Sequence, residues 1–189
     1  MANITVFCGS SSGGDGAFRQ MAERLGTEIA NARHRLVYGG GHVGLMGAVA
    51  DGVLSAGGEV TGVITEQLKS LEVAHSTLSL LEVEATMHTR KARMAELADG
   101  VIVLPGGFGT LDETFEILTW NQLGIVSLPV VFLDVDGYFE SLFDFVGRVV
   151  DAGFMKPEHG GLAQRTVDPA AAVALATSPP TAYSPKWVD

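Results

Sequence analysis

Pro105-Gly106-Gly107-Phe108-Gly109-Thr110-Leu111-Asp112-Glu113 directly follows the apolar run Val101-Ile102-Val103-Leu104. This order predicts a buried strand, a glycine turn and the start of a helix within one short segment. Glycines let backbone N–H groups approach a ligand closely, and the helix that follows points its positive end at the same place. The stretch therefore predicts an anion site of the kind that holds phosphate.

Two carboxylates, Asp112 and Glu113, follow the glycines where a phosphate-binding loop usually carries a lysine. Acid groups beside an anion site indicate chemistry on a phosphorylated substrate. A structural interpretation is also open, because Thr110 and Glu113 have the Ser/Thr-x-x-Glu spacing of a capping box. In that interpretation Thr110 caps the helix, and Asp112 only stabilises the helix dipole.

The rest of the chain alternates strand-like and helix-like runs. Strands are expected at residues 4–8, 36–38, 59–64, 78–83, 100–104 and 129–133, with a strand or turn near Thr166. Helices are expected at residues 17–33, 45–56, 85–98, 110–123, 138–151 and 169–176, and residues 65–77 are expected to be irregular. This alternation predicts an α/β fold, a Rossmann-like doubly wound parallel sheet with helices on both faces. We expect a single domain over residues 1–177 and a tail over 178–189.

Composition excludes several classes of protein. The 189 residues are 47% hydrophobic and carry a formal net charge of −10, which suits a globular chain and disfavours binding to nucleic acid or an anionic membrane. The single cysteine, Cys8, cannot form an internal disulfide and is expected to be a small buried residue. No apolar run approaches the ~20 residues of a membrane span, and no signal peptide is evident, so a cytoplasmic location is expected.

Two further glycine-rich turns follow predicted strands, at residues 9–14 and 39–47. Alone, the first turn is better explained as a flexible connection than as an anion contact. The second loosely fits a dinucleotide fingerprint, but it does not follow the first strand, and the acid at the expected distance, Glu59, begins a strand instead of ending one. It is therefore interpreted as a mononucleotide-binding wall, with His42 as either a ligand contact or a solvated loop residue.

Basic residues lie on an apolar helix stripe. Met87 and Met94 define the stripe, and Arg90 and Lys91 fall on it at positions i+3 and i+4 from Met87. A charge on a face that should be buried needs a partner. We expect Arg90 to recognise a phosphate or a carboxylate, whereas for Lys91 a snorkelling position at the helix edge is an equal alternative.

Together these parts suit cleavage of an N-glycosidic bond. Such a reaction builds positive charge on the ribose ring, as glycoside hydrolysis does. Glu113 could stabilise that charge or activate water, while the glycine turn holds the 5′-phosphate and Arg90 orients the carboxylate or the substrate.

Three stretches of this sequence resemble motifs of a known family. The stretch at 105–113 matches the PGGxGTxxE motif of the LOG (Lonely Guy) cytokinin riboside 5′-monophosphate phosphoribohydrolases. The segment Met87-His88-Thr89-Arg90-Lys91-Ala92-Arg93-Met94 is similar to the family's second signature, and residues 38–47 give a third match. The similarity runs from about Ile4 to Phe154.

The resemblance implies hydrolysis of (N6-substituted) adenosine 5′-monophosphates to free base and ribose 5-phosphate, without a cofactor or a metal. It implies a homodimer or larger homo-oligomer. From the sequence, Trp120 and nearby apolar residues could belong either to the core or to an interface. Arg90 and Glu113 would be the catalytic residues. The implied substrate contacts are Glu72, Lys91, Gly106, Gly107, Phe108, Gly109, Thr110, Leu111, Asp112 and Thr119.

Three other functions fit parts of this sequence. Molybdenum cofactor carrier proteins resemble this family and need no catalytic pair, so a nucleotide or cofactor carrier is the main alternative. An NAD-dependent oxidoreductase is disfavoured by the misplaced fingerprint. Relatives are often labelled lysine decarboxylases, but no lysine lies in a setting that marks a Schiff base with pyridoxal phosphate.

Overall fold

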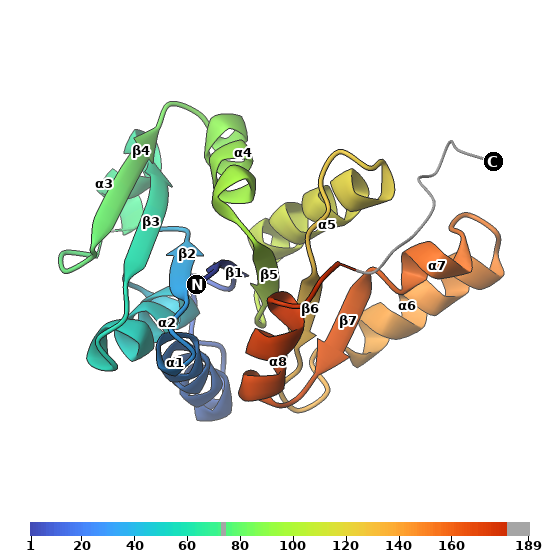
Figure 1. The fold of residues 1–189 in the computed structure, drawn as a ribbon, viewed down its shortest axis with the longest axis horizontal. Coiled ribbons are helices and arrows are strands. Elements are labelled where there is room, and N and C mark those ends of the chain that lie inside the picture. Colours follow the sequence, from blue (N-terminus) through green and yellow to red (C-terminus); the bar gives the residue numbers. More distant parts are fainter. Residues whose placement is uncertain (73–74, 181–189) are drawn as a thin grey trace.

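A computed structural model describes residues 1–72 and 75–180. In this part of the chain, parallel strands form one sheet in the order β4-β3-β2-β1-β5-β6-β7 (Figure 1). The strands are β1 (Asn3–Phe7), β2 (Arg35–Tyr38), β3 (Val60–Thr65), β4 (Leu80–Glu84), β5 (Gly100–Val103), β6 (Val130–Leu133) and β7 (Ala163–Thr166). The predicted parallel α/β sheet is confirmed.

Helices cover both faces of the sheet. They are α1 (Gly16–Asn31), α2 (Gly44–Ser55), α3 (Glu66–Glu72), α4 (Met87–Leu97), α5 (Phe108–Gln122), α6 (Glu140–Asp151), α7 (Pro157–Gly160) and α8 (Pro169–Ala176). Residues of α1, α2 and α8 form one core with one face of the sheet, and residues of α4, α5 and α6 form a second core on the other face. The strands are apolar on both sides because both faces are covered, and every residue of β5 and β6 is buried.

Two glycines explain how closely α1 and α2 pack. A Cβ atom on Gly26 would lie 2.3 Å from the carbonyl oxygen of Val49, and one on Gly52 would lie 2.3 Å from that of Glu23. Each helix thus presents a glycine to the backbone of the other. No larger side chain fits at either position without separating the helices.

The direction of winding reverses between β1 and β5. From β1 the chain builds outward through β2, β3 and β4, and it then returns to the other side of β1 with β5, β6 and β7. Ligands of open α/β sheets bind beside the carboxyl ends of strands at such a reversal. The glycine turns at residues 9–14, 39–44 and 105–109 follow β1, β2 and β5, so the fold brings all three to this edge.

The main error in the sequence prediction concerns residues 65–77. Residues Glu66–Glu72 form helix α3, because the segment is rich in helix-forming residues and the Thr65 hydroxyl accepts a 3.2 Å hydrogen bond from the N–H of Leu68. The seven residues of α3 are too few for apolar spacing to predict a helix there. The short helix α7 was also missed, whereas the segment near Thr166 is an edge strand, β7.

The ends of the other elements agree with the predicted ones to within about two residues. Residues 181–189 of the expected tail lie outside the described residues. None of the helices in the described ranges has the length and hydropathy that crossing a membrane requires.

Candidate active site

Arg90 is placed by a well-capped helix. Thr86 precedes α4, its hydroxyl accepts a hydrogen bond from the N–H of Thr89 (3.1 Å), and the Thr89 hydroxyl accepts one from the N–H of Thr86 (3.2 Å). This reciprocal pair is a capping box with threonine in place of the usual glutamate. It fixes the first turn of α4, and Arg90 follows one residue later on the buried face, only 5% exposed.

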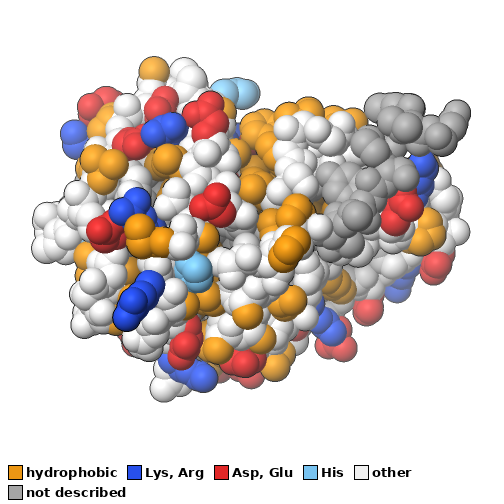
Figure 2. Space-filling model, in the orientation of Figure 1, with side chains coloured by type: hydrophobic (Ala, Val, Ile, Leu, Met, Phe, Trp, Pro, Cys, Tyr) orange, Lys and Arg blue, Asp and Glu red, His pale blue; other side chains and the backbone are white. Residues whose placement is uncertain are grey.

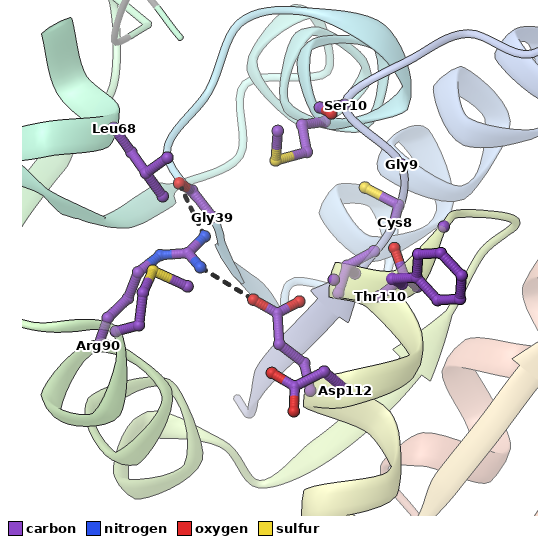
Figure 3. A pocket seen from close by; sticks show the side chains of 15 residues that line it. Cys8, Gly9, Ser10, Gly39, Leu68, Arg90, Thr110 and Asp112 are labelled. Atoms are coloured by element: carbon purple, nitrogen blue, oxygen red, sulfur yellow. Dashed lines mark hydrogen bonds and ion pairs between the residues drawn. The ribbon is translucent and has the colours of Figure 1, made fainter. Parts of the chain in front are cut away.

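The guanidinium of Arg90 contacts three acceptors, one on α5, one on β3 and one in the turn after β2. Its Nη1 donates to Glu113 Oε1 on α5 at 2.9 Å, its Nε to the carbonyl oxygen of Val63 on β3 at 2.8 Å, and its Nη2 to that of Gly39 at 3.2 Å. Figure 3 shows Arg90 reaching from α4 across the cavity toward Gly39. The predicted partner of the buried cation is thus a carboxylate, Glu113.

Gly39 makes this arrangement possible. A Cβ atom at this position would lie 2.4 Å from Arg90 Nη2. The sequence predicts that the turn after β2 forms a wall of a nucleotide site; in the structure Gly39 lines the cavity and also accommodates the arginine that holds Glu113.

The predicted capping box at Thr110 is wrong. Helix α5 begins earlier, at Phe108, with Gly107 as its N-cap, and no side chain caps it. Thr110 is a buried residue inside the first turn, and Glu113 pairs with Arg90 instead of reaching back along its own helix. The first turn contains no acidic residue, so Asp112 does not stabilise the helix dipole there.

The uncapped helix end remains available to a ligand. The first N–H groups of a helix have no partner within the helix, and a glycine N-cap supplies no side-chain acceptor. Gly107, Phe108 and Gly109 are exposed, so a bound anion can reach this end.

These groups share one cavity. It has a volume of about 380 Å³, in the range of small-molecule sites, and its lining includes Gly39, Arg90, Asp112, Glu113 and the residues 107–110. Among the lining residues the one cation is Arg90, which is already paired with Glu113. An anion here would therefore depend on backbone N–H groups and the helix dipole more than on a basic side chain.

Burial sets the ionisation of Glu113. Its side chain is 12% exposed, and burial, helped by the nearby negative charge of Asp112, raises the pKa of the carboxyl above its usual value even though Arg90 and Lys91 oppose this. The rise moves the carboxyl toward the pKa that suits a general base near neutral pH.

The glycine turn is held by close backbone packing. The N–H of Gly9 donates to the carbonyl of Pro105 at 3.0 Å, and the N–H of Leu45 donates to the carbonyl of Gly9 at 3.0 Å. A Cβ atom on Gly106 would lie 2.1 Å from Thr110 Oγ1 and 2.9 Å from the Gly9 nitrogen. The turns after β1 and β5 therefore support each other.

A glycine pair tests this packing. Gly106→Ala should destabilise the fold by about 1–3 kcal/mol, because the methyl group overlaps Thr110 and the Gly9 backbone. Gly109→Ala meets nothing within 4 Å and lies in α5, so it should leave stability unchanged or raise it slightly. Urea unfolding measures both, and equal stability of the two variants would contradict the packing argument.

Lys91 pairs with two acids of α5. Its Nζ lies 2.9 Å from Asp112 Oδ2 and 3.3 Å from Glu116 Oε2. Burial alone would lower the pKa of Lys91, but these two partners outweigh it and raise the pKa. Lys91 thus joins α4 to α5 beside the Arg90–Glu113 pair, with its stem largely covered.

The other expected contacts divide into two groups. Gly107, Phe108, Gly109, Thr110 and Asp112 line the cavity, whereas Gly106, Leu111 and Thr119 do not. Leu111 and Thr119 lie along a shallow surface on α5, and the Thr119 hydroxyl donates to the carbonyl of Phe115 at 2.7 Å. Glu72 is the last residue of α3, and its side chain lies outside the described part of the chain.

Sequence reasoning did not assign several lining residues to the site. Leu68 of the unpredicted helix α3 and Met87 contribute apolar surface, and Ser10 lines both this cavity and a second one. Cys8 also lines the cavity but is buried, and burial together with the Glu113 charge raises its thiol pKa, so it is not a reactive nucleophile. His42 is exposed and lines neither cavity.

Comparisons of the sequence with known proteins identify a matching family model and similar proteins. A family model described as "Possible lysine decarboxylase" matches residues 46–176. The cytokinin riboside 5′-monophosphate phosphoribohydrolase LOG7 of Arabidopsis thaliana is 49% identical over 154 residues, which are 82% of this chain and 71% of the relative. A phosphoribohydrolase of the same name from Rhodococcoides fascians is 46% identical over 156 residues, 82% of this chain and 79% of the relative.

Solved structures share the fold at lower identity. The molybdenum cofactor carrier protein of Chlamydomonas reinhardtii aligns with a TM-score of 0.69 at 22% identity, covering 92% of this chain and 94% of that one. The molybdenum cofactor binding protein of Rippkaea orientalis has the same TM-score at 23% identity and the same coverage. At this identity the likeness concerns the fold alone.

Proposed function

This chain belongs to the LOG family of cytokinin riboside 5′-monophosphate phosphoribohydrolases, and from that premise we propose that it hydrolyses the N-glycosidic bond of (N6-substituted) adenosine 5′-monophosphates. The observation that carries the proposal is the buried pair of Arg90 and Glu113 beside an uncapped, exposed helix end. The pair supplies a fixed carboxylate, and the helix end supplies donors for a phosphate.

The substrate's phosphate binds at the turn formed by residues 106–110. Backbone N–H groups at the start of α5 donate to its oxygens, and the helix dipole favours its charge. The ribose then lies in the 380 Å³ cavity with C1′ near Glu113, and the base extends toward apolar surface contributed by Leu68 and Met87.

Glu113 acts on the ribosyl carbon. As the C1′–N9 bond breaks, its electrons pass to the base and positive charge develops on the ribose, which the carboxylate stabilises. Water supplies hydroxide to C1′, its proton passes to Glu113 and then to the departing base, and the products are free base and ribose 5-phosphate. Arg90 holds the carboxylate in place through Nη1, while its other contacts fix the guanidinium itself.

The direct test is incubation of the protein with isopentenyladenosine monophosphate and with AMP, followed by chromatography of the free base. Release of isopentenyladenine, adenine or both is expected, and the ratio of the two rates measures the preference for an N6 substituent. Absence of free base from both nucleotides would refute the proposed function.

Activity should depend on pH through Glu113. The carboxyl must be ionised to act, and its pKa is raised above 4.5, so kcat should fall on the acid side at a pH above that value. A bound phosphate adds negative charge nearby and moves the pKa in the same direction. A kcat profile from about pH 4 to 9 measures this, and full activity down to pH 4.5 would contradict it.

A carrier function is the second candidate. Both neighbours have names that refer to the molybdenum cofactor, and they share the fold. A carrier needs no carboxylate fixed by an arginine at its binding site, whereas this chain has one. Copurification of a pterin without nucleotide turnover would reverse the preference.

A homo-oligomer, a cytoplasmic location and the division into a domain of residues 1–177 and a tail of 178–189 are further proposals.

The exposed face of α5 supports an interface between copies of the chain, because the side chain of Phe108 is 94% exposed and that of Phe115 is 40% exposed. In Figure 2 hydrophobic side chains gather where α4 and α5 meet in Figure 1. Trp120 packs against the second core, which supports its assignment as a core residue. Thr119 does not line the cavity of its own protomer, so in this proposal it contacts the nucleotide of a second copy. Light scattering measures whether the protein forms such an assembly, and a monomer would contradict it.

A further inference from the structure

Tyr138 lies in a tight turn between β6 and α6, at the same edge of the sheet as the cavity. Two consecutive residues of this turn have left-handed backbone conformations, Asp136 at φ 52° and Gly137 at φ 74°. A non-glycine residue in this region costs energy, and it persists where the surrounding contacts offset that cost. The turn directs Tyr138 back toward the glycine turn that follows β5.

The Tyr138 hydroxyl contacts that turn directly. It donates a hydrogen bond of 2.7 Å to the carbonyl oxygen of Gly106. Its ring packs edge to face against Phe18 (5.8 Å between centroids) and against Phe139 (5.0 Å). These contacts hold the ring on two sides, so the hydroxyl has a defined position although the residue is 47% exposed.

The hydrogen bond fixes one peptide group of the turn at residues 106–110, where the phosphate is proposed to bind. In a planar trans peptide the carbonyl and the N–H point in opposite directions, and no cis peptide bond occurs in the described residues. Since Tyr138 holds the Gly106 carbonyl, the N–H of Gly107 must point away from Tyr138. Gly107 lies between two cavities. It lines the cavity that contains Glu113, and it also lines a second cavity of about 340 Å³ that Tyr138 lines.

The peptide between two glycines rotates more freely than other peptides, because neither residue has a Cβ atom. Reversal of the peptide between Gly106 and Gly107 would turn a carbonyl oxygen toward a bound anion and replace attraction by repulsion. We propose that Tyr138 is a positioning residue for the substrate's phosphate: its hydroxyl holds this peptide so that the Gly107 N–H faces the anion. This inference rests on the proposed function in one respect, that the ligand carries a phosphate.

Tyr138→Phe tests the proposal because it removes the hydroxyl and keeps the ring. Binding of ribose 5-phosphate and of adenosine is measured by calorimetry, and the KM for AMP is measured alongside. Ribose 5-phosphate should bind about fivefold more weakly and the KM for AMP should rise by a similar factor, as expected for loss of one hydrogen bond, while adenosine affinity stays unchanged. Unchanged ribose 5-phosphate binding, or equal weakening of both ligands, would overturn the proposal.

Phe18→Leu is the matched control. It removes one ring contact of Tyr138 and keeps the hydroxyl and the Phe139 contact. Because the Phe139 contact still holds the ring, the ratio of ribose 5-phosphate affinity to adenosine affinity should change less than in Tyr138→Phe, and a phosphate-specific loss as large as that of Tyr138→Phe would overturn the role of the hydroxyl. Wild-type protein that binds ribose 5-phosphate but hydrolyses no nucleotide would refute the proposed function and leave this inference standing.

Discussion

Replacing Glu113 with glutamine is expected to lower kcat by about 10³-fold and to destabilise the fold by about 1–3 kcal/mol without unfolding it, because the buried Arg90 cation loses its negative partner but keeps a hydrogen-bond acceptor. The amide has the shape of the carboxylate, and its oxygen can still accept the hydrogen bond from Arg90 Nη1. The amide lacks the negative charge and the basicity that the proposed mechanism requires of Glu113. Base release from AMP measures the effect, and urea unfolding shows whether the fold is intact.

Glu116→Gln is the matched control for this loss. Glu116 lies on the same helix three residues later, pairs with Lys91 at 3.3 Å and does not line the cavity. Lys91 keeps its second partner, Asp112, in this variant. Activity should stay within about twofold of the wild type, because partly exposed ion pairs contribute about 0–1 kcal/mol. If Glu113→Gln lost no more activity than Glu116→Gln, the role assigned to Glu113 would be wrong.

Replacing Arg90 with methionine is expected to destabilise the protein by about 3–5 kcal/mol at neutral pH and to reduce activity at least as strongly as Glu113→Gln. The substitution leaves the Glu113 carboxylate buried without its partner, and it removes the donors to the carbonyls of Val63 and Gly39. Arg90→Lys keeps the charge but cannot reach three acceptors, so about a 10²-fold loss of kcat is expected.

The pH dependence of the Arg90→Met variant separates the charge effect from packing. Without Arg90 the pKa of Glu113 rises further, because the charge that opposed the effect of burial is gone. When the pKa of a carboxyl is higher in the folded state than in the unfolded state, the free energy of unfolding of the protein decreases as the pH rises from the unfolded-state pKa to the folded-state pKa. The variant should therefore recover part of its stability as the pH falls from 7 toward 4.5.

A double substitution provides the second check. Arg90→Met with Glu113→Gln removes both charges, so it should be more stable at neutral pH than Arg90→Met alone, although it stays inactive. Coupling of about 0.5–3 kcal/mol between the two sites is expected from residues in direct contact. If the effects of the two single substitutions on the free energy of unfolding added up to that of the double substitution, Arg90 and Glu113 would not act as one unit.

Most of the framework of the fold could be predicted from local sequence. Continuous apolar runs such as residues 101–104 and 130–133 predict buried parallel strands, and helical spacing predicts α1 and α4. Helix α3 was missed because seven residues do not establish a period, and α7 because four residues are fewer still. The start of α5 was placed two residues late, since Thr110 and Glu113 have a capping-box spacing that the backbone does not use.

The sequence by itself determined the chemistry available to this protein: a glycine turn at a helix start, a carboxylate at Glu113 and a basic residue at Arg90 on an apolar stripe. Local patterns carry that information because they depend on neighbours a few residues apart. Only the tertiary structure decided which charges meet. Arg90 and Glu113 are 23 residues apart, and Gly39 is 51 residues from Arg90, so only the strand order brings them together. The same packing paired Lys91 with Asp112 and Glu116 and placed the Tyr138 hydroxyl on the carbonyl oxygen of Gly106.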